Sequence, residues 1–288
     1  MATVNYASKY SAKIDERFTK SSITAPAINN DYDFTGVKTV RVYSIPIVAM
    51  GDYNRSGANR YGTPDELGDS VQEMTLSKDR AFTFTIDRGN HDDQMMVKNA
   101  GVALRRQVDE VVIPEIDKYR LKVIAEGAKN SATAALTKAD AYAAFLDGME
   151  ALTDELAPAS GRICYASTNY YKLLKQDDNF IKASELGQQV KFTGQLGAVD
   201  GVPIIVVPKS WMPTNAAFVI TNPIACCAPV KLSEYKIHEN PPGISGWLVE
   251  GRVYYDAFIL NNKKGAIYTH LTAAVSEEGP TEGETVTD

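Results

Sequence analysis

The sequence holds few of the residues that carry most enzyme chemistry. It contains three histidines, His91, His238 and His270, and three cysteines among 288 residues. It lacks the glycine-rich phosphate loops, the C-x-x-C and H-E-x-x-H metal motifs and the G-x-S-x-G nucleophile motif. The histidines are far apart, and we expect His238 and His270 at exposed strand positions. The sequence therefore predicts no catalytic, cofactor-binding or metal-binding site, and a protein that is not an enzyme.

The sequence also lacks a disulfide framework, a membrane-spanning or secretory segment and an excess of positive charge, which excludes further classes of protein. Cys164, Cys226 and Cys227 are odd in number and two are adjacent, so we expect small buried thiols in a reducing cytoplasm rather than a disulfide framework. No apolar run reaches the roughly 18 residues of a membrane span, and residues 1–6 lack the features of a secretory signal. The formal net charge of -6 is unlike that of proteins that grip nucleic acid by its phosphates.

The first third of the chain predicts an arm followed by a long hairpin. Residues 1–36 have sparse apolar side chains and predict an extended arm. Val37–Val48 is rich in β-branched residues, and Met74–Arg88 alternates apolar and polar side chains, so both predict strands. The polar stretch Gly51–Glu73 between them predicts the tip of a hairpin over 37–88. Because an isolated hairpin is only marginally stable, we expect it to lie on another surface, in the same chain or in a neighbouring subunit.

A long helix is predicted after the hairpin. Apolar side chains recur at helical spacing over residues 90–127, where Asn90 suits the start and Gly127 the end. At the usual rise per residue such a helix is about 55 Å long. Pro114 removes one backbone hydrogen bond, so we expect a kink there.

The remaining residues predict a compact α/β region and then a second set of strands. The compact region is expected to hold two helices and two of its strands at 137–157, 169–175, 162–166 and 216–221. The almost continuous apolar run Gly201–Pro208 predicts a third strand, buried on both faces. Leu232–His238, Trp247–Leu260 and Gly265–Leu271 predict a sheet packed against the long helix. The acidic residues 274–288 predict a disordered tail.

In this order of elements the sequence resembles the major capsid proteins of tailed bacteriophages, which have the Hong Kong 97-like fold. The stretches that carry the resemblance are Asn5–Ala7, Ile14–Phe18, Phe34–Val40, Val112–Arg120, Gly201–Pro208 and Gly251–Phe258. The resemblance implies an α+β fold with an N-terminal arm (1–36), an extended β-hairpin or E-loop (37–88), a spine helix of the P domain (89–128), an A domain (129–228), the P-domain β-sheet (229–273) and the acidic tail (274–288).

The resemblance also implies a function. A major capsid protein self-assembles from pentamers and hexamers into an icosahedral head, and the head encloses double-stranded DNA without sequence-specific binding. Portal, scaffold or decoration proteins are expected partners, and a membrane is not. The protein would be a virion component assembled in the host cytoplasm. Many relatives begin with a long charged helical segment that acts as an internal scaffold, whereas only residues 1–36 precede the hairpin here, so we expect a separate scaffold or none.

The hairpin tip holds the residues that we expect to contact a neighbouring subunit. They are Tyr53, Arg55, Arg60 and Tyr61. Tyrosine and arginine are favoured at interface hot spots because they combine a large contact area with hydrogen-bonding groups. The alternative is a solvated loop without a partner.

Three other classes of protein remain as alternatives. The first is an encapsulin-type nanocompartment shell protein, which has the same fold and would load an enzyme as cargo. The second is an α/β enzyme over residues 130–273, against which the missing motifs argue. The third is another virion protein, such as a tail-tube or decoration subunit, and the long predicted helix does not suit a mostly β tail tube.

Overall fold

The computed structural model describes residues 22–272, apart from residues 33, 35–36, 65, 90–99 and 178–196. The expectations for the start of the arm, the start of the long helix and the acidic tail therefore lie outside the described residues. The helices are α3 (Ala100–Gln107), the π-helical turn η2 (Val108–Val112), α4 (Ile113–Glu126), α5 (Ala141–Asp154) and α6 (Thr168–Gln176), with 3-10 turns η1 (Ala25–Ala27), η3 (Pro223–Ala225) and η4 (Asn261–Ala266). The strands are β1 (Thr39–Ser44), β2 (Ser70–Thr75), β3 (Lys78–Asp87), β4 (Asn130–Thr133), β5 (Ile163–Ser167), β6 (Ala198–Val199), β7 (Val202–Val207), β8 (Ala216–Thr221), β9 (Cys226–Cys227), β10 (Val230–Glu239), β11 (Gly246–Tyr255), β12 (Phe258–Ile259) and β13 (Ile267–Leu271).

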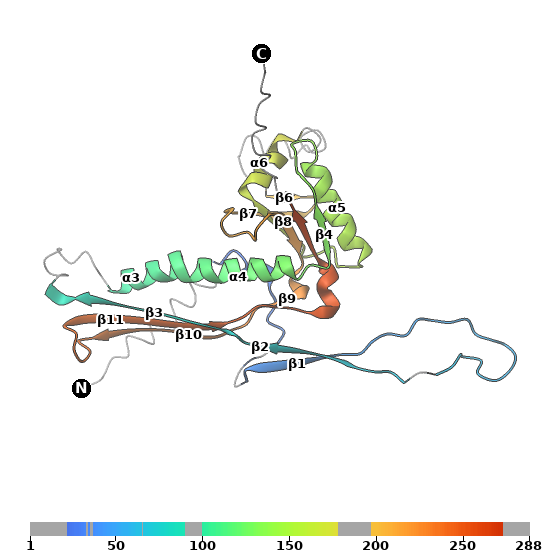
Figure 1. Ribbon diagram of the computed structural model, residues 1–288, viewed down its shortest axis with the longest axis horizontal. Coiled ribbons are helices and arrows are strands. Elements are labelled where there is room, and N and C mark those ends of the chain that lie inside the picture. Colours follow the sequence, from blue (N-terminus) through green and yellow to red (C-terminus); the bar gives the residue numbers. More distant parts are fainter. Residues whose placement is uncertain are drawn as a thin grey trace, which may run out of the picture.

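The molecule has three parts that meet near its middle (Figure 1). The long helix lies along a three-stranded antiparallel sheet of order β10-β11-β3 and reaches to one side. The β1–β2 hairpin reaches to the other side, and a compact part stands above the junction. Leu104, Val108, Ile113 and Ile116 of the helix pack on one face of the sheet, against Tyr235, Val249, Val253 and Tyr255.

The long helix is interrupted just before Pro114. We expected a kink at this proline, and the structure has the π-helical turn η2 immediately before it, so that Pro114 lies in the first turn of α4. The Ile113 N–H donates to the Val108 carbonyl, which closes the wider turn. Because the helix continues through η2 into α4, Pro114 leaves one carbonyl of the preceding turn without a backbone donor, and a π-helical turn is one of the irregularities found at such interruptions.

The expected hairpin pairing is wrong in one respect. The strand Met74–Arg88 was expected to pair with Val37–Val48, but only β2 pairs with β1, and β3 crosses to pair with β11. The two residues between β2 and β3 form the corner. The reason is burial: Phe82, Phe84 and Ile86 alternate along β3 and can cover their apolar side chains only against the long helix and its sheet.

The compact part is a six-stranded sheet of order β4-β13-β8-β5-β7-β6. One face packs on α5 and α6 and the other on the end of α4, so the sheet has a core on each side. The run Gly265–Leu271 was expected in one sheet with Leu232–His238 and Trp247–Leu260, but β13 pairs with β4 and β8 instead, in the sheet that packs on the end of the long helix. Its first four residues are all buried, which suits a central strand covered on both faces.

Two further expectations need correction. β7 is not buried throughout, since Val206 is 38% exposed, because β7 is followed only by the two-residue edge strand β6. His270 was expected at an exposed position, but it is 3% exposed and its ring stacks on Phe218 at 5.2 Å. Burial lowers the pKa of His270.

The expectation of buried cysteines that form no disulfide is confirmed. Cys164, Cys226 and Cys227 are free and buried, and burial raises the pKa of each thiol. Such thiols are poor nucleophiles because the reactive thiolate is disfavoured. Within the described ranges, no group of three His, Cys, Asp or Glu side chains is placed to hold a metal ion. No helix there is long and apolar enough to cross a membrane.

Candidate functional site

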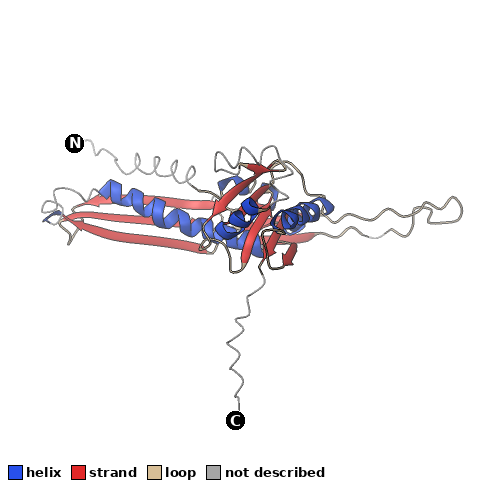
Figure 2. Ribbon diagram, turned by 90° about the horizontal axis from the view of Figure 1, so that it is seen from above, coloured by secondary structure: helices blue, strands red, loops and turns tan. Residues whose placement is uncertain are grey.

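The projecting hairpin is where the described residues expose most of their apolar surface. Of the fifteen large apolar side chains that are exposed, ten belong to the segment from Val37 to Val71, namely Val37, Tyr43, Ile45, Ile47, Val48, Met50, Tyr53, Tyr61, Leu67 and Val71. Ile47 is 97% and Met50 100% exposed. Both views show this segment reaching away from the rest of the ribbon (Figures 1 and 2). A concentrated exposed apolar surface on a folded protein commonly marks an interaction site.

The structure places the four predicted tip residues on one loop and brings the rings of Tyr53 and Tyr61 into contact. The rings of Tyr53 and Tyr61 meet edge to face at 5.0 Å. The tip is closed by a hydrogen bond from the Asn54 N–H to the Arg60 carbonyl (3.0 Å) and by the Arg60 side chain, which donates from Nε to the Gly57 carbonyl (3.3 Å). All four predicted side chains, including Arg55, are exposed. The tip is therefore an ordered, solvent-exposed loop that carries two arginine side chains and two tyrosine rings.

The two legs of the hairpin separate at Pro46. The Leu76 N–H donates to the Lys38 carbonyl (3.1 Å), which makes Lys38 and Leu76 a hydrogen-bonded pair. Such pairs alternate in an antiparallel ladder, so the last one formed is Ser44 with Ser70. The next would join residues 46 and 68, and Pro46 has no N–H to donate. Beyond Ser44 the legs continue without regular pairing.

A separate apolar cluster fixes the base of the hairpin. Met74 and Leu76 of the hairpin are fully buried there, against Phe34, Cys227 and Leu260. Gln72 adds a polar clamp. Its side-chain Nε2 donates to the Ile259 carbonyl (2.8 Å), and its Oε1 accepts from the Asn261 N–H (2.9 Å). The Gln72 side-chain amide thus donates one hydrogen bond and accepts another, as a backbone peptide group does in a β-sheet.

Asp256 ties the β2–β3 corner to the long helix. Its buried carboxylate accepts hydrogen bonds from the Ser77 N–H (2.7 Å), the Ser77 hydroxyl (2.8 Å) and the Tyr119 hydroxyl (2.6 Å). Burial and the neighbouring Asp256 carboxylate raise the pKa of Tyr119, so this hydroxyl stays a donor. These hydrogen bonds hold the β2–β3 corner against α4.

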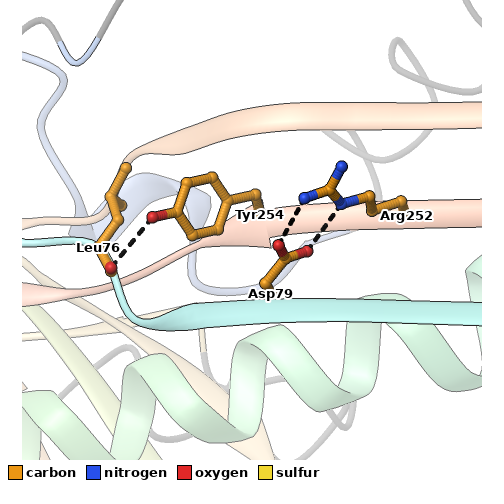
Figure 3. Close-up of polar contacts among 4 residues, drawn as sticks. All are labelled: Leu76, Asp79, Arg252 and Tyr254. Atoms are coloured by element: carbon orange, nitrogen blue, oxygen red, sulfur yellow. Dashed lines mark hydrogen bonds and ion pairs between the residues drawn. The ribbon is translucent and has the colours of Figure 1, made fainter. Parts of the chain in front are cut away.

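Two contacts beside the corner are drawn in Figure 3. The Tyr254 hydroxyl donates to the Leu76 carbonyl (3.1 Å). Arg252 of β11 donates two hydrogen bonds to Asp79 of β3 (2.9 and 2.6 Å), and this pairing lowers the pKa of the Asp79 carboxyl. Because this ion pair is exposed, we expect it to contribute little to stability.

Asp117 is a buried structural residue that the sequence reasoning missed. Its buried carboxylate accepts from the Ser22 hydroxyl (2.6 Å), the Ile23 N–H (3.0 Å) and the Thr24 hydroxyl (2.5 Å), so it fixes the point where the N-terminal arm meets α4. Arg120 is buried beside it and donates to the Ala228 carbonyl (3.2 Å). The available signal was their spacing of three residues within an amphipathic helix, which puts both charges on one face.

No protein-family model matches the chain, and no curated protein matches it in sequence. Solved structures do match. A chain of Mycobacterium phage Che8 superposes with a TM-score of 0.72 at 15% identity, covering 86% of this chain and 90% of that chain. The mature capsid of bacteriophage PhiM1 gives 0.70 at 10% identity, covering 88% of each chain. A virus-like particle from Pyrococcus furiosus gives 0.55 at 14% identity, covering 93% of this chain and 100% of that one.

These matches establish the fold. The chain has the α+β Hong Kong 97-like fold of phage capsid proteins over most of its length, as the resemblance predicted.

Proposed function

We propose that this chain is the major capsid protein of a tailed bacteriophage or prophage. The observation that carries the proposal is the projecting hairpin, which presents apolar side chains that its own chain leaves uncovered, on a fold found in assembled capsids. Apolar surface of this kind is stabilised when another molecule buries it. In a shell, many copies bury one another's projections, and folding and assembly become linked.

The proposed role is structural rather than catalytic. Pentamers and hexamers of this chain would form an icosahedral head that encloses double-stranded DNA without reading its sequence. The net charge of -6 fits a wall that does not hold the DNA by its phosphates. Portal, scaffold or decoration proteins would complete a virion assembled in the host cytoplasm. We propose the division given above, with the arm, E-loop, spine helix, A domain, P-domain sheet and tail.

The degree of structural similarity favours a phage capsid over an encapsulin-type shell. Phage structures give TM-scores from 0.72 down to 0.55 and the virus-like particle gives 0.55, so the highest scores belong to phage chains. An encapsulin would load an enzyme as cargo, so purified particles that carry a co-expressed enzyme would favour that alternative.

We also propose that the tip residues contact the neighbouring copy. Arg55 and Arg60 give the tip two positive charges beside two tyrosine rings. The double variant Arg55→Glu/Arg60→Glu should leave the fold intact and block shell formation, because it reverses the charge of the contact. Normal shells from this variant would show that the tip charges are not used.

Electron microscopy of the purified chain tests the proposed function. Closed particles tens of nanometres across are the expected result, from the chain alone or with a scaffold protein encoded beside it. A chain that stays monomeric under both conditions would contradict the proposal.

A further inference from the structure

A pocket of about 350 Å³ lies in the compact part, at the start of α6. Figure 1 shows α6 at the end of the compact part that faces away from the long helix. The other walls of the pocket are the loop 208–215 between β7 and β8 and the end of β13. None of the residues that form the hairpin tip or the hairpin base lines it. The pocket is therefore separate from the site described above.

The lining of the pocket is mixed in character. Its larger apolar side chains are Leu136, Tyr170, Leu173 and Met212. Its polar side chains are Ser167, Asn169, Lys209, Ser210, Thr214, Asn215 and Thr272. Lys209 is the one charged residue among the described residues of the lining, and it is exposed. Such a lining suits a short peptide segment that carries an apolar side chain close to a carboxylate.

The chain itself continues from the wall of this pocket into the acidic tail. Thr272, which lines the pocket, is the last residue before 273–288. Its N–H and its hydroxyl both donate to the Asn215 carbonyl (2.7 and 3.1 Å), and Asn215 also lines the pocket. These two hydrogen bonds fix the point from which residues 273–288 start.

Residues 273–288 have the chemistry that the pocket suits. They hold five acidic residues and no basic residue, and Val275 comes shortly before Glu277 and Glu278. Glu277 is five residues after Thr272, so it can lie up to about 17 Å away from it. A segment on so short a connection has an effective concentration of about millimolar or more at the pocket. A weak contact between opposite charges is then enough to populate the bound state.

We propose that Val275–Glu278 of the acidic tail binds in this pocket of its own copy, with Val275 on the apolar wall and Glu277 or Glu278 beside Lys209. The tail of a second copy has the same chemistry, but it lacks the short connection through Thr272 that raises the effective concentration. The docking would hold whether or not the chain forms a shell, so its failure would leave the proposed function standing.

Methyl NMR of the full chain tests the docking. Three residues of the lining carry methyl groups that report on the pocket, namely Leu136, Leu173 and Met212. Glu277→Gln/Glu278→Gln should shift their signals, because it removes the charges that the lysine of the pocket attracts. Glu282→Gln/Glu284→Gln is the matched control, since it removes the same charge further along the tail, and it should leave the signals in place. Equal shifts from the two variants, or no shift from either, would overturn the inference.

A lysine variant separates docking from a general effect of charge. In a chain that carries Lys209→Glu, the substitutions Glu277→Gln/Glu278→Gln should no longer shift the methyl signals, because two sites couple in this way when they are in contact. Lys172→Glu is the control, since Lys172 is exposed on α6 and does not line the pocket, and it should leave the shift unchanged. An undiminished shift in the Lys209→Glu chain would overturn the inference.

Carbodiimide coupling tests the same contact in the unaltered chain. The reagent joins a lysine amine to a neighbouring carboxylate as an amide and takes up the water that is lost. Mass spectrometry should find Lys209 joined to Glu277 or Glu278 about threefold or more often than Lys172, as expected for one exposed ion pair. Equal yields at the two lysines would overturn the inference. In a mixture of isotope-labelled and unlabelled chains, both joined peptides should come from one chain. Mixed pairs would assign the contact to a second copy and overturn the proposal for the same copy.

Discussion

Apolar side chains are buried in the six-stranded sheet but exposed in the distal part of the hairpin. Every residue of β8 is buried, as is every residue of β5. In the hairpin, Met74 at the base is fully buried, whereas Met50 in the first leg is fully exposed. The difference does not lie in composition, since both regions are rich in β-branched and apolar residues. The difference is whether other described residues of the same chain pack on these side chains and bury them.

The change from buried to exposed side chains occurs over a few residues of the hairpin. Up to Ser44 and Ser70 the hairpin is paired and its base is packed in an apolar cluster. Beyond Pro46 the legs have neither regular pairing nor packing. We infer that the compact part and the hairpin base fold on the strength of their own contacts, and that the distal hairpin acquires its contacts on assembly.

The largest expected effect on stability is in the six-stranded sheet. Phe218 is fully buried and its ring lies 4.4 Å from that of Tyr170. Phe218→Ala should lower the free energy of unfolding by about 3–5 kcal/mol, because it removes apolar contacts and leaves a cavity. Chemical denaturation measures the change. Tyr61→Ala at the tip is the control and should change it by less than about 0.5 kcal/mol. Equal losses would remove the distinction between the two regions.

A smaller loss is expected at the hairpin base. Asp256→Ala leaves the Ser77 N–H and the Tyr119 hydroxyl without their acceptor, which should cost about 2–3 kcal/mol by chemical denaturation. Asp79→Ala, which breaks an exposed ion pair, is the matched aspartate control and should cost less than about 1 kcal/mol. A neutral Asp256→Ala would show that the corner is not held by this carboxylate.

The stability of the compact part should also depend on pH through His270. Burial lowers its pKa in the folded protein, so the unfolded chain binds a proton more readily. Stability is therefore fully present above about pH 6.5 and falls as the pH drops below that value. Thermal unfolding between pH 5 and pH 8 should show this dependence, and His270→Phe should reduce it. An unchanged pH dependence in His270→Phe would assign the effect to other groups.

The smallest expected effect on stability is in the exposed leg. Ile47→Asp should change the free energy of unfolding by less than about 0.5 kcal/mol, because the side chain contacts solvent in the free subunit. The same variant should prevent assembly. Met74→Asp is the contrasting substitution, since it puts a charge into the apolar cluster at the base and should unfold that region. Thermal unfolding and sedimentation velocity of both variants make the comparison.

The sequence predicts local structure well where the pattern is local. The compact-part helices, the strand Ala216–Thr221 and the amphipathic long helix all lie close to their expected positions. The errors concern which elements pair. β3 and β13 were expected in the wrong sheets, and His270 was expected to be exposed, because strand pairing and burial depend on distant partners that periodicity does not report.

The position of the tip residues on the hairpin was predicted from the sequence, and their contact with a neighbouring copy stays a prediction. Tyr53, Arg55, Arg60 and Tyr61 gather on one tip, as their position between two strands implied. The apolar leg was missed because Val37–Val48 was taken to be one paired strand. Its signal was the absence of charge from Ile45 to Gly51 together with Pro46, which ends the ladder.

Shortening the hairpin tests the central claim most directly. Ser44 and Ser70 are paired opposite each other, so residues 45–69 can be replaced by the two-residue turn Asn-Gly, which suits a tight hairpin. We predict a chain that unfolds at the same temperature as the full chain and, by sedimentation velocity and electron microscopy, forms no particles under conditions in which the full chain does. Particles of normal size from the shortened chain would contradict the claim that the distal hairpin exists to bind a second copy.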